Sequence, residues 1–300
     1  MIEPQLASKQ ALIGVHGFRF AGGVYVVGGV WKKFRRWPTL VCGIVLLGIL
    51  VLLAIFAPWI SHFDPLKHDL VSSLKPPSMA HWFGTDNFGR DIFSRSLHAL
   101  RLDLAIGIFG VCFAFMFGVF FGVVAGFCGG WLENFIMRLV DVFFAFPFAV
   151  LMIAMISILG PGIQNMIVAF TLSGWGAYAR IARAETLVVK RTEYIAASEA
   201  LGMPIVSILA RHVVPNIISA AVVFSVADVV LVILSAASLS FLGLGVAPPT
   251  PELGAMISEG RSFILFAWWP VTLPGLVIVT TAIALSLVGD GVSELLRPTR

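Results

Sequence analysis

One acidic side chain lies in the middle of an otherwise apolar stretch. Within residues 216–241, Asp228 is the one charged residue. A carboxylate at the centre of a membrane-spanning helix costs about 2.5–3.5 kcal/mol unless it faces protein or water. Asp228 is therefore a candidate to line a polar passage, where it could meet a cationic group of a solute. The alternative is a hydrogen bond that ties this helix to a neighbouring one.

Residues that could support catalysis or bind a metal do not form a recognisable motif. The sequence has no Gly-Lys pair, so a phosphate-binding Walker loop is absent. It also lacks the Gly-x-Ser-x-Gly elbow of hydrolases. His62 and His68 share a segment with several aspartates but lack the spacing of metal ligands on a regular element. We therefore predict no catalytic residue, no metal site and no directly bound cofactor.

The connection 187–215 has the pattern of a docking surface. Residues 193–201 predict a short helix with small side chains, Gly202 ends it, and Pro204 suits the first turn of the next helix. Apolar residues then recur at helical spacing at Ile205, Ile208, Leu209 and Val213. Two short helices with an exposed apolar stripe would fit a groove on a soluble partner, whereas an interfacial helix would need no partner. The residues expected to make the contact are Ala196, Ala197, Glu199, Gly202, Arg211 and Pro215.

A second segment, 81–101, alternates turn-forming residues with charges. We expect Arg90 and Arg95 to pair with Asp86 and Asp91 on an exposed surface and to stiffen this loop. The loop is either a contact surface for an external protein or a structural cap, since exposed ion pairs often contribute little. The residues proposed for the contact are Thr85, Asp86, Gly89, Arg90 and Asp91.

A further ion pair is expected at the end of one predicted helix. Arg138 and Asp141 are three residues apart, which places them on one helix face. Their pairing would lower the cost of placing charges near lipid.

The amino-acid composition indicates whether the chain folds in water or in a membrane. Hydrophobic residues make up 59% of the chain and charged residues 12%, too few charges to cover a water-soluble surface. A spanning helix needs about 20 mostly apolar residues. The sequence therefore predicts an all-α membrane protein with about six transmembrane helices. Their predicted ranges are 37–61, 104–132, 136–158, 164–186, 216–241 and 268–289.

Basic residues predict how the chain crosses the membrane. They cluster just before the first span and in the connection 187–215, which indicates a cytoplasmic location for both. The chain then divides into a cytoplasmic tail (1–36), a first span (37–61), an outward loop (62–101), a five-helix core (102–290) and a cytoplasmic tail (291–300). Both termini are expected in the cytoplasm.

Several motifs resemble one family of transporters. Residues 81–101 are similar to the Gly-Thr-Asp-x-x-Gly-Arg-Asp-x-x-Ser-Arg segment of dipeptide and oligopeptide permeases. Gly202, nine intervening residues and His-Val-Val-Pro at 212–215 have the spacing of the signature loop of binding-protein-dependent ABC importer permeases. Residues 196–198 read Ala-Ala-Ser where that family has Glu-Ala-Ala, so the usual first glutamate is absent. Further matches lie at 239–245, 248–254 and 289–291.

The resemblance to the C-type subunit of these permeases implies a fold, partners and a cargo. It implies the type I ABC importer (MetI-like) permease fold in the bacterial inner membrane, with 187–215 docked on an ATPase subunit. The implied partners are a homologous permease subunit in a heterodimer, two cytoplasmic ATPase subunits that bind ATP and Mg²⁺, and an extracytoplasmic substrate-binding protein. Membrane lipid surrounds the chain, and no nucleic acid is involved. Short peptides are the expected cargo; nickel chelates, glutathione and opines remain alternatives.

Two other classes of protein remain open. An intramembrane enzyme would need a nucleophile and a base inside the spans, but no histidine lies in the middle of another predicted span to assist Asp228. A secondary transporter or channel could use Asp228 as a proton site. A stable ATPase partner would distinguish the ABC permease from both.

Overall fold

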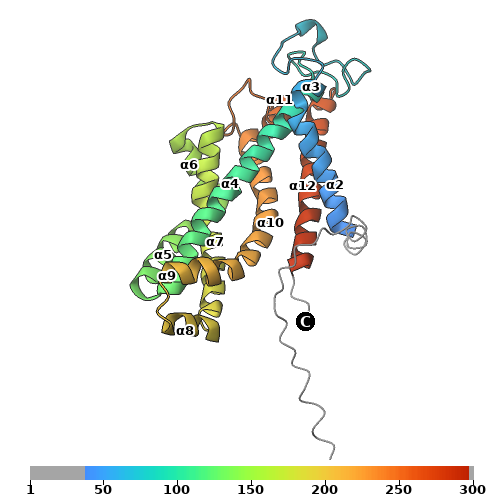
Figure 1. The fold of residues 1–300 in the computed structure, drawn as a ribbon. Coiled ribbons are helices and arrows are strands. Elements are labelled where there is room, and N and C mark those ends of the chain that lie inside the picture. The colour runs from blue at the N-terminus through green and yellow to red at the C-terminus, as the bar shows by residue number, and fades with distance from the viewer. Residues whose placement is uncertain (1–37, 297–300) are drawn as a thin grey trace, which may run out of the picture. The chain divides into compact units, whose positions relative to one another are not determined.

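In the computed structural model, residues 38–296 are described, and they form helices joined by loops (Figure 1). The predicted tail 1–36 and residues 297–300 lie outside the described residues. The α-helices are α2 (Pro38–Ile55), α3 (Ala57–Ile60), α4 (Ile92–Cys128), α5 (Gly130–Phe144), α6 (Phe148–Leu159), α7 (Ile163–Val189), α8 (Glu193–Ala200), α9 (Ile205–Ile208), α10 (Val214–Phe241), α11 (Leu253–Gly260) and α12 (Trp269–Leu296). A π-helical turn, η2 (Leu209–Val213), joins α9 to α10.

Four helical segments of the described chain are long and apolar enough to cross a membrane. They are α2, α4, the run Ile205–Phe241 and α12. The pair α5–α6 makes a fifth if it is counted as one broken span. The all-α membrane fold is therefore confirmed, and four of the six predicted spans correspond to these helices.

The third predicted span, 136–158, is not one straight helix. Helix α5 ends at Phe144, α6 begins at Phe148, and the two are bent by 91°. Pro147 accounts for the break, because it lacks a backbone N–H and disfavours helical geometry in the residue before it. The predicted separation of the spans 136–158 and 164–186, at Gly160-Pro161-Gly162, is confirmed, since α6 ends at Leu159 and α7 begins at Ile163.

The fourth predicted span, 164–186, corresponds to α7. This helix has 27 residues and is about 40 Å long at 1.5 Å per residue. Its C-terminal half carries Arg180, Arg183 and Glu185, so it does not qualify as apolar enough by composition. Helix α7 packs against α4, α5, α6 and α10, and a helix covered by protein can be more polar than one that faces lipid.

Helix α4 is longer than predicted because its N-terminus is capped. The Asp91 carboxylate accepts a hydrogen bond from the backbone N–H of Ser94 at 2.8 Å, which satisfies one free donor of the first turn. Ten or more residues that were assigned to the outward loop thus belong to the helix, which starts at Ile92. At the C-terminal end, α4 stops at Gly129, which has a φ of +67°.

Three glycines at four-residue spacing let α4 and α7 approach closely. We call Gly118, Gly122 and Gly126 the glycine seam. A Cβ at Gly122 would overlap the carbonyl oxygen of Ala179 and come within 2.8 Å of the Ala182 Cβ. At Gly126 it would lie 2.9 Å from the Arg183 carbonyl oxygen. Small residues at this spacing are the usual device for tight helix pairing in lipid, where apolar burial gives little drive.

Substituting the central residue of the glycine seam tests this packing. We expect Gly122→Ala to lower the free energy of unfolding by about 1–3 kcal/mol, because the methyl group overpacks the interface. Gly48→Ala in α2 is the matched control, since a Cβ there meets nothing within 4 Å. Thermal unfolding of the purified variants in detergent measures the difference, and equal melting temperatures would contradict the importance of the seam.

Candidate functional site

Asp228 lies in the wall of a cavity of about 430 Å³. Helix α10 supplies Asp228 and α7 supplies Tyr178, whose hydroxyl donates a hydrogen bond to Asp228 Oδ2 at 2.7 Å. The residues that line the cavity are Phe143, Phe144, Phe146, Phe148, Leu151, Ser173, Gly174, Ala177, Asp228, Leu231, Val232 and Ser235. The cavity is thus mostly apolar, with one carboxylate and two hydroxyls.

Four phenylalanines reach the cavity because of the break between α5 and α6. Phe143 and Phe144 come from the end of α5, Phe146 from the bend and Phe148 from the first turn of α6. A straight helix would distribute these neighbouring residues around its whole circumference. With the 91° bend, all four line the same cavity.

Tyr178 is held firmly in place. Its side chain is fully buried, and its ring packs edge-on against Phe115 and Phe224 with centroid distances of 5.7 and 5.1 Å. Edge-to-face aromatic pairs of this kind fix the ring and so aim the hydroxyl. The hydrogen bond that was an alternative for Asp228 therefore exists, and it coexists with the cavity.

The connection 187–215 folds as two short helices at the opposite end of the described unit from α3 and α11 (Figure 1). Ile195 and Ser198 of α8 point inward and are buried. All residues predicted to make the partner contact are exposed, namely Ala196, Ala197, Glu199, Gly202, Arg211 and Pro215. The geometry leaves them accessible, and their contact with a partner stays a prediction.

The predicted apolar stripe of this segment is wrong in part. Ile208 and Val213 are buried in the main core, and Leu209 packs against the same core. The exposed apolar side chains are instead Leu201, Ile205 and Val206, at 82%, 56% and 77% exposure. The π-helical turn that follows α9 has i→i+5 hydrogen bonds, as from the Val214 N–H to the Leu209 carbonyl oxygen, and so changes which residues face inward.

Gly202 separates the two short helices. Its φ of +73° is a conformation that L side chains rarely adopt, and its N–H donates to the Glu199 carbonyl oxygen at 2.9 Å. A Cβ at this position would meet nothing within 4 Å, so the surface around it is open.

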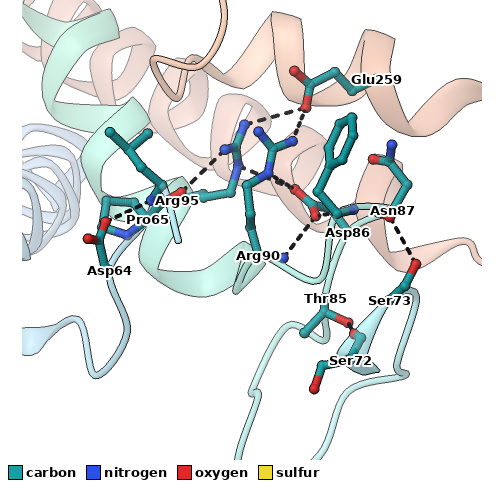
Figure 2. A network of polar contacts seen from close by, with 12 residues as sticks. Asp64, Pro65, Ser72, Ser73, Thr85, Asp86, Asn87, Arg90, Arg95 and Glu259 are labelled. Atoms are coloured by element: carbon teal, nitrogen blue, oxygen red, sulfur yellow. Dashed lines mark hydrogen bonds and ion pairs between the residues drawn. The ribbon is translucent and has the colours of Figure 1, made fainter. Parts of the chain in front are cut away.

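The charged loop before α4 is buried, which corrects the expected exposed surface. Figure 2 shows the side chains of Arg90 and Arg95 reaching Asp86 and Glu259. Arg90 Nε lies 2.6 Å from Asp86 Oδ2 and Arg90 Nη2 lies 2.6 Å from Glu259 Oε2. Arg95 lies 3.6 Å from Asp86 and 3.4 Å from Glu259. We call these four residues the arginine cluster.

Asp91 is not part of the arginine cluster, contrary to the prediction that it pairs with an arginine. Its Oδ1 lies 2.9 Å from His81 Nδ1, and Oδ2 caps α4. Thr85 is fully buried; its hydroxyl donates to the Ser72 carbonyl oxygen at 2.5 Å and accepts from the Lys75 N–H at 2.8 Å.

Gly89 is buried as well. A Cβ there would overlap the backbone of Asp69, so this close approach of two loop segments requires glycine. The five residues proposed for receptor contact thus all lie inside the loop. Their burial supports the structural-cap interpretation for these side chains.

The predicted Arg138–Asp141 pair is replaced by a pair between helices. Asp141 Oδ1 lies 2.8 Å from Arg180 Nη2 of α7, with side-chain exposures of 64% and 46%. The Arg180 guanidinium also lies over the Phe144 ring, 4.0 Å from its centroid. Asp141 of α5 thus pairs with Arg180 of the neighbouring helix α7 instead of with Arg138 of its own helix.

Sequence reasoning missed the partners contributed by distant segments. Tyr178 and Glu259 carry no local signal, because their roles depend on which helices become neighbours. The glycine seam did have a signal, a glycine at every fourth residue of an apolar run.

A buried pair of carboxyl groups was also missed. Glu252 is fully buried at the start of α11, where its Oε2 accepts from the Ala255 N–H at 2.7 Å, and Asp103 of α4 is buried as well. Burial raises the pKa of Glu252. Glu252 Oε1 and both carboxyl oxygens of Asp103 have no hydrogen-bond partner among the described residues.

Comparison with known proteins gives a consistent result. Residues 118–300 match the family model of the binding-protein-dependent transport system inner membrane component. Residues 28–77 match the N-terminal transmembrane domain of oligopeptide transport permease C. The chain is 41% identical over 269 residues to the glutathione transport system permease protein GsiD of Escherichia coli O6:K15:H31, covering 89% of each chain. The same identity and coverage hold for GsiD of Shigella boydii serotype 4.

Two solved structures share the fold. The MetNI methionine ABC transporter in inward-facing conformations aligns with a TM-score of 0.55 and 20% identity, over 68% of this chain and 97% of that chain. An amino acid ABC transporter with histidines aligns with a TM-score of 0.52 and 14% identity, over 69% and 95%. The all-α MetI-like architecture is therefore confirmed.

The contrast between the arginine cluster and the exposed Asp141–Arg180 pair gives a test. We expect Asp86→Asn to lower the free energy of unfolding by about 3–5 kcal/mol, because it leaves two buried guanidinium groups with Glu259 as the one remaining acidic partner of the cluster. Asp141→Asn, the same chemical change at an exposed pair, should cost about 0–1 kcal/mol. Thermal unfolding in detergent compares the two, and equal losses would show that burial of the cluster does not matter.

Proposed function

The chain belongs to the family of inner-membrane components of binding-protein-dependent transport systems, and from that membership we propose that it forms half of a passage for short peptides. It is an ABC importer permease subunit, and members of this family work with a binding protein and with ATPase subunits. The GsiD relatives are named for glutathione, which is itself a peptide-like molecule. We extend that cargo class to this chain.

One observation carries the proposal: the exposed segment and the cavity wall belong to one continuous helical run. The run Ile205–Phe241 includes α9, the π-helical turn and α10. Its first residues expose Ile205 and Val206, and its middle carries Asp228 in the cavity wall. Force applied at α9 would therefore move the wall of the cavity without passing through a flexible loop.

We infer that an ATPase subunit binds the segment 187–215. Leu201, Ile205 and Val206 form an exposed apolar patch around the open surface at Gly202. An apolar helix face that projects beyond the spans suits a groove on a soluble partner. ATP and Mg²⁺ then bind to the ATPase subunits, and the permease itself needs no cofactor and catalyses no reaction.

The coupling follows from differential binding. A loaded binding protein favours the state with the cavity open outward, and ATP favours the state that its subunits close. Since both act on the same pair of permease states, each changes the affinity for the other. The second permease subunit, a homologue, would complete the passage across the exposed side of the cavity.

Replacing Gly202 tests the docking role. We expect Gly202→Leu to reduce ATP-dependent peptide uptake about tenfold or more, because the side chain projects into the partner interface. Gly243→Leu is the matched control: it has φ of +82°, and a Cβ there also meets nothing within 4 Å. Uptake and receptor-stimulated ATPase activity are measured in proteoliposomes that contain the complete transporter.

The result for Gly202 is interpretable because both substitutions impose the same kind of backbone strain. Equal melting temperatures with unequal uptake support docking. Equal uptake by the two variants contradicts it. Uptake that persists with inactivated ATPase subunits would instead favour a secondary transporter.

Accessibility labelling tests the proposed orientation. We expect Leu201→Cys to react with a membrane-impermeant maleimide from the cytoplasmic side alone, because basic residues surround this segment. Met79→Cys, in the loop before α4 and 95% exposed at that position, should react from the outer side alone. Labelling of intact cells and of inverted vesicles distinguishes the sides, and outer labelling of Leu201→Cys would overturn the docking proposal.

A further inference from the structure

The Asp228 carboxyl group has no basic partner among the described residues. Tyr178 is the one side chain within residues 38–296 that hydrogen-bonds the Asp228 carboxylate, and it engages Oδ2. No Lys, Arg or His of this part of the chain forms an ion pair with it. A half-buried carboxylate in an apolar wall is costly unless a cation or proton compensates it.

The remaining lining of the cavity suits a cation. Phe144, Phe146 and Phe148 line it and each expose about half of their surface (48%, 53% and 46%). The face of a phenyl ring attracts an ammonium or guanidinium group within about 6 Å. The Phe144 ring already binds a cation in this way, since the Arg180 guanidinium lies 4.0 Å from its centroid.

The lining of the cavity disfavours an anionic ligand. Its lining contains no Lys or Arg, and its two hydroxyls, Ser173 and Ser235, are the remaining polar side chains. Ser173 already donates its hydroxyl hydrogen to the Ala169 carbonyl oxygen of its own helix. An anionic group would therefore meet Asp228 without a counter-charge.

We propose that this cavity is a cargo subsite that binds an ammonium group, with Asp228 as its ion-pair partner and the phenylalanines as its aromatic wall. The proposal rests on the proposed permease function and makes it more specific. The free amino terminus of a short peptide supplies such a group. A volume of about 430 Å³ lies within the usual range of small-molecule sites, about 300–1,000 Å³.

Tyr178 positions the carboxylate in this scheme. Its hydroxyl occupies one carboxylate oxygen, which leaves the other for the ammonium group. If Asp228 only joined α10 to α7, its hydrogen bond to Tyr178 would be its sole function. Tyr178→Phe and Asp228→Asn would then have the same effect.

The test compares a tripeptide that has a free amino terminus with its N-acetylated form. Binding of radiolabelled tripeptide to the purified complete transporter is measured by equilibrium dialysis, without the binding protein and without nucleotide. We expect Asp228→Asn to weaken binding of the free peptide about tenfold or more, as for the loss of one charge-assisted hydrogen bond. Asp228→Glu should retain part of the affinity. The acetylated peptide should compete poorly with the radiolabelled free peptide for binding to the wild-type transporter.

Matched variants separate charge from packing. Tyr178→Phe should weaken binding much less than Asp228→Asn. Glu294→Gln removes an exposed carboxylate near the end of α12 and should leave binding unchanged. Equal binding by wild type and Asp228→Asn, or equal competition by the free and acetylated peptides, overturns the ammonium subsite.

Uptake assays keep this inference distinct from the proposed function. In proteoliposomes, ATP-driven uptake of the free peptide by wild type, with reduced uptake by Asp228→Asn and normal uptake by Glu294→Gln, supports the subsite. Uptake that is the same in Asp228→Asn overturns the subsite but leaves the permease intact. Absence of ATP-driven peptide uptake by wild type counts against the proposed function itself.

Discussion

The close approach of α4 and α7 is the constraint on which the other features depend. Because the glycine seam carries no side chains, the backbone of α7 lies directly on α4. Gly118 faces the Cβ of Tyr178, so any side chain at Gly118 would displace the tyrosine. Tyr178 in turn holds Asp228 of α10. The packing of α4 against α7 thus fixes Tyr178 and, through it, the position of Asp228 on α10.

Helix α4 also connects the glycine seam to the loop at its N-terminal end. Arg95, in the first turn of α4, is buried against Asp86 and Glu259, which joins the loop before α4 to α11. Asp103, two turns further on, is buried close to Glu252, which caps α11. Because α4 is one uninterrupted helix of 37 residues, displacement of the arginine cluster would be transmitted to the glycine seam.

The sequence predicted those features that depend on local composition. The apolar runs gave the spans, the break at 160–162 followed from Gly-Pro-Gly, and the exposed positions of 187–215 followed from small and polar residues. Features that need a partner far along the chain were missed. Glu259 completes the arginine cluster from a position 169 residues after Arg90, and no pattern near either residue indicates the other. The inward turn of Ile208 and Val213 was missed because a π-helical turn shifts the register that a regular helix would keep.

Irregular backbone in this chain occurs where function is proposed. The α5–α6 bend gathers the aromatic wall, and the π-helical turn joins the docking segment to α10. Within a membrane, backbone groups freed by such breaks need partners in protein or water, so breaks persist only where the surrounding structure satisfies them. Helix α7 packs against both arms of the bend, and at η2 the Val214 N–H donates to the Leu209 carbonyl oxygen. The two irregularities thus lie at the two places to which a role is assigned, the aromatic wall of the cavity and the junction between the docking segment and α10.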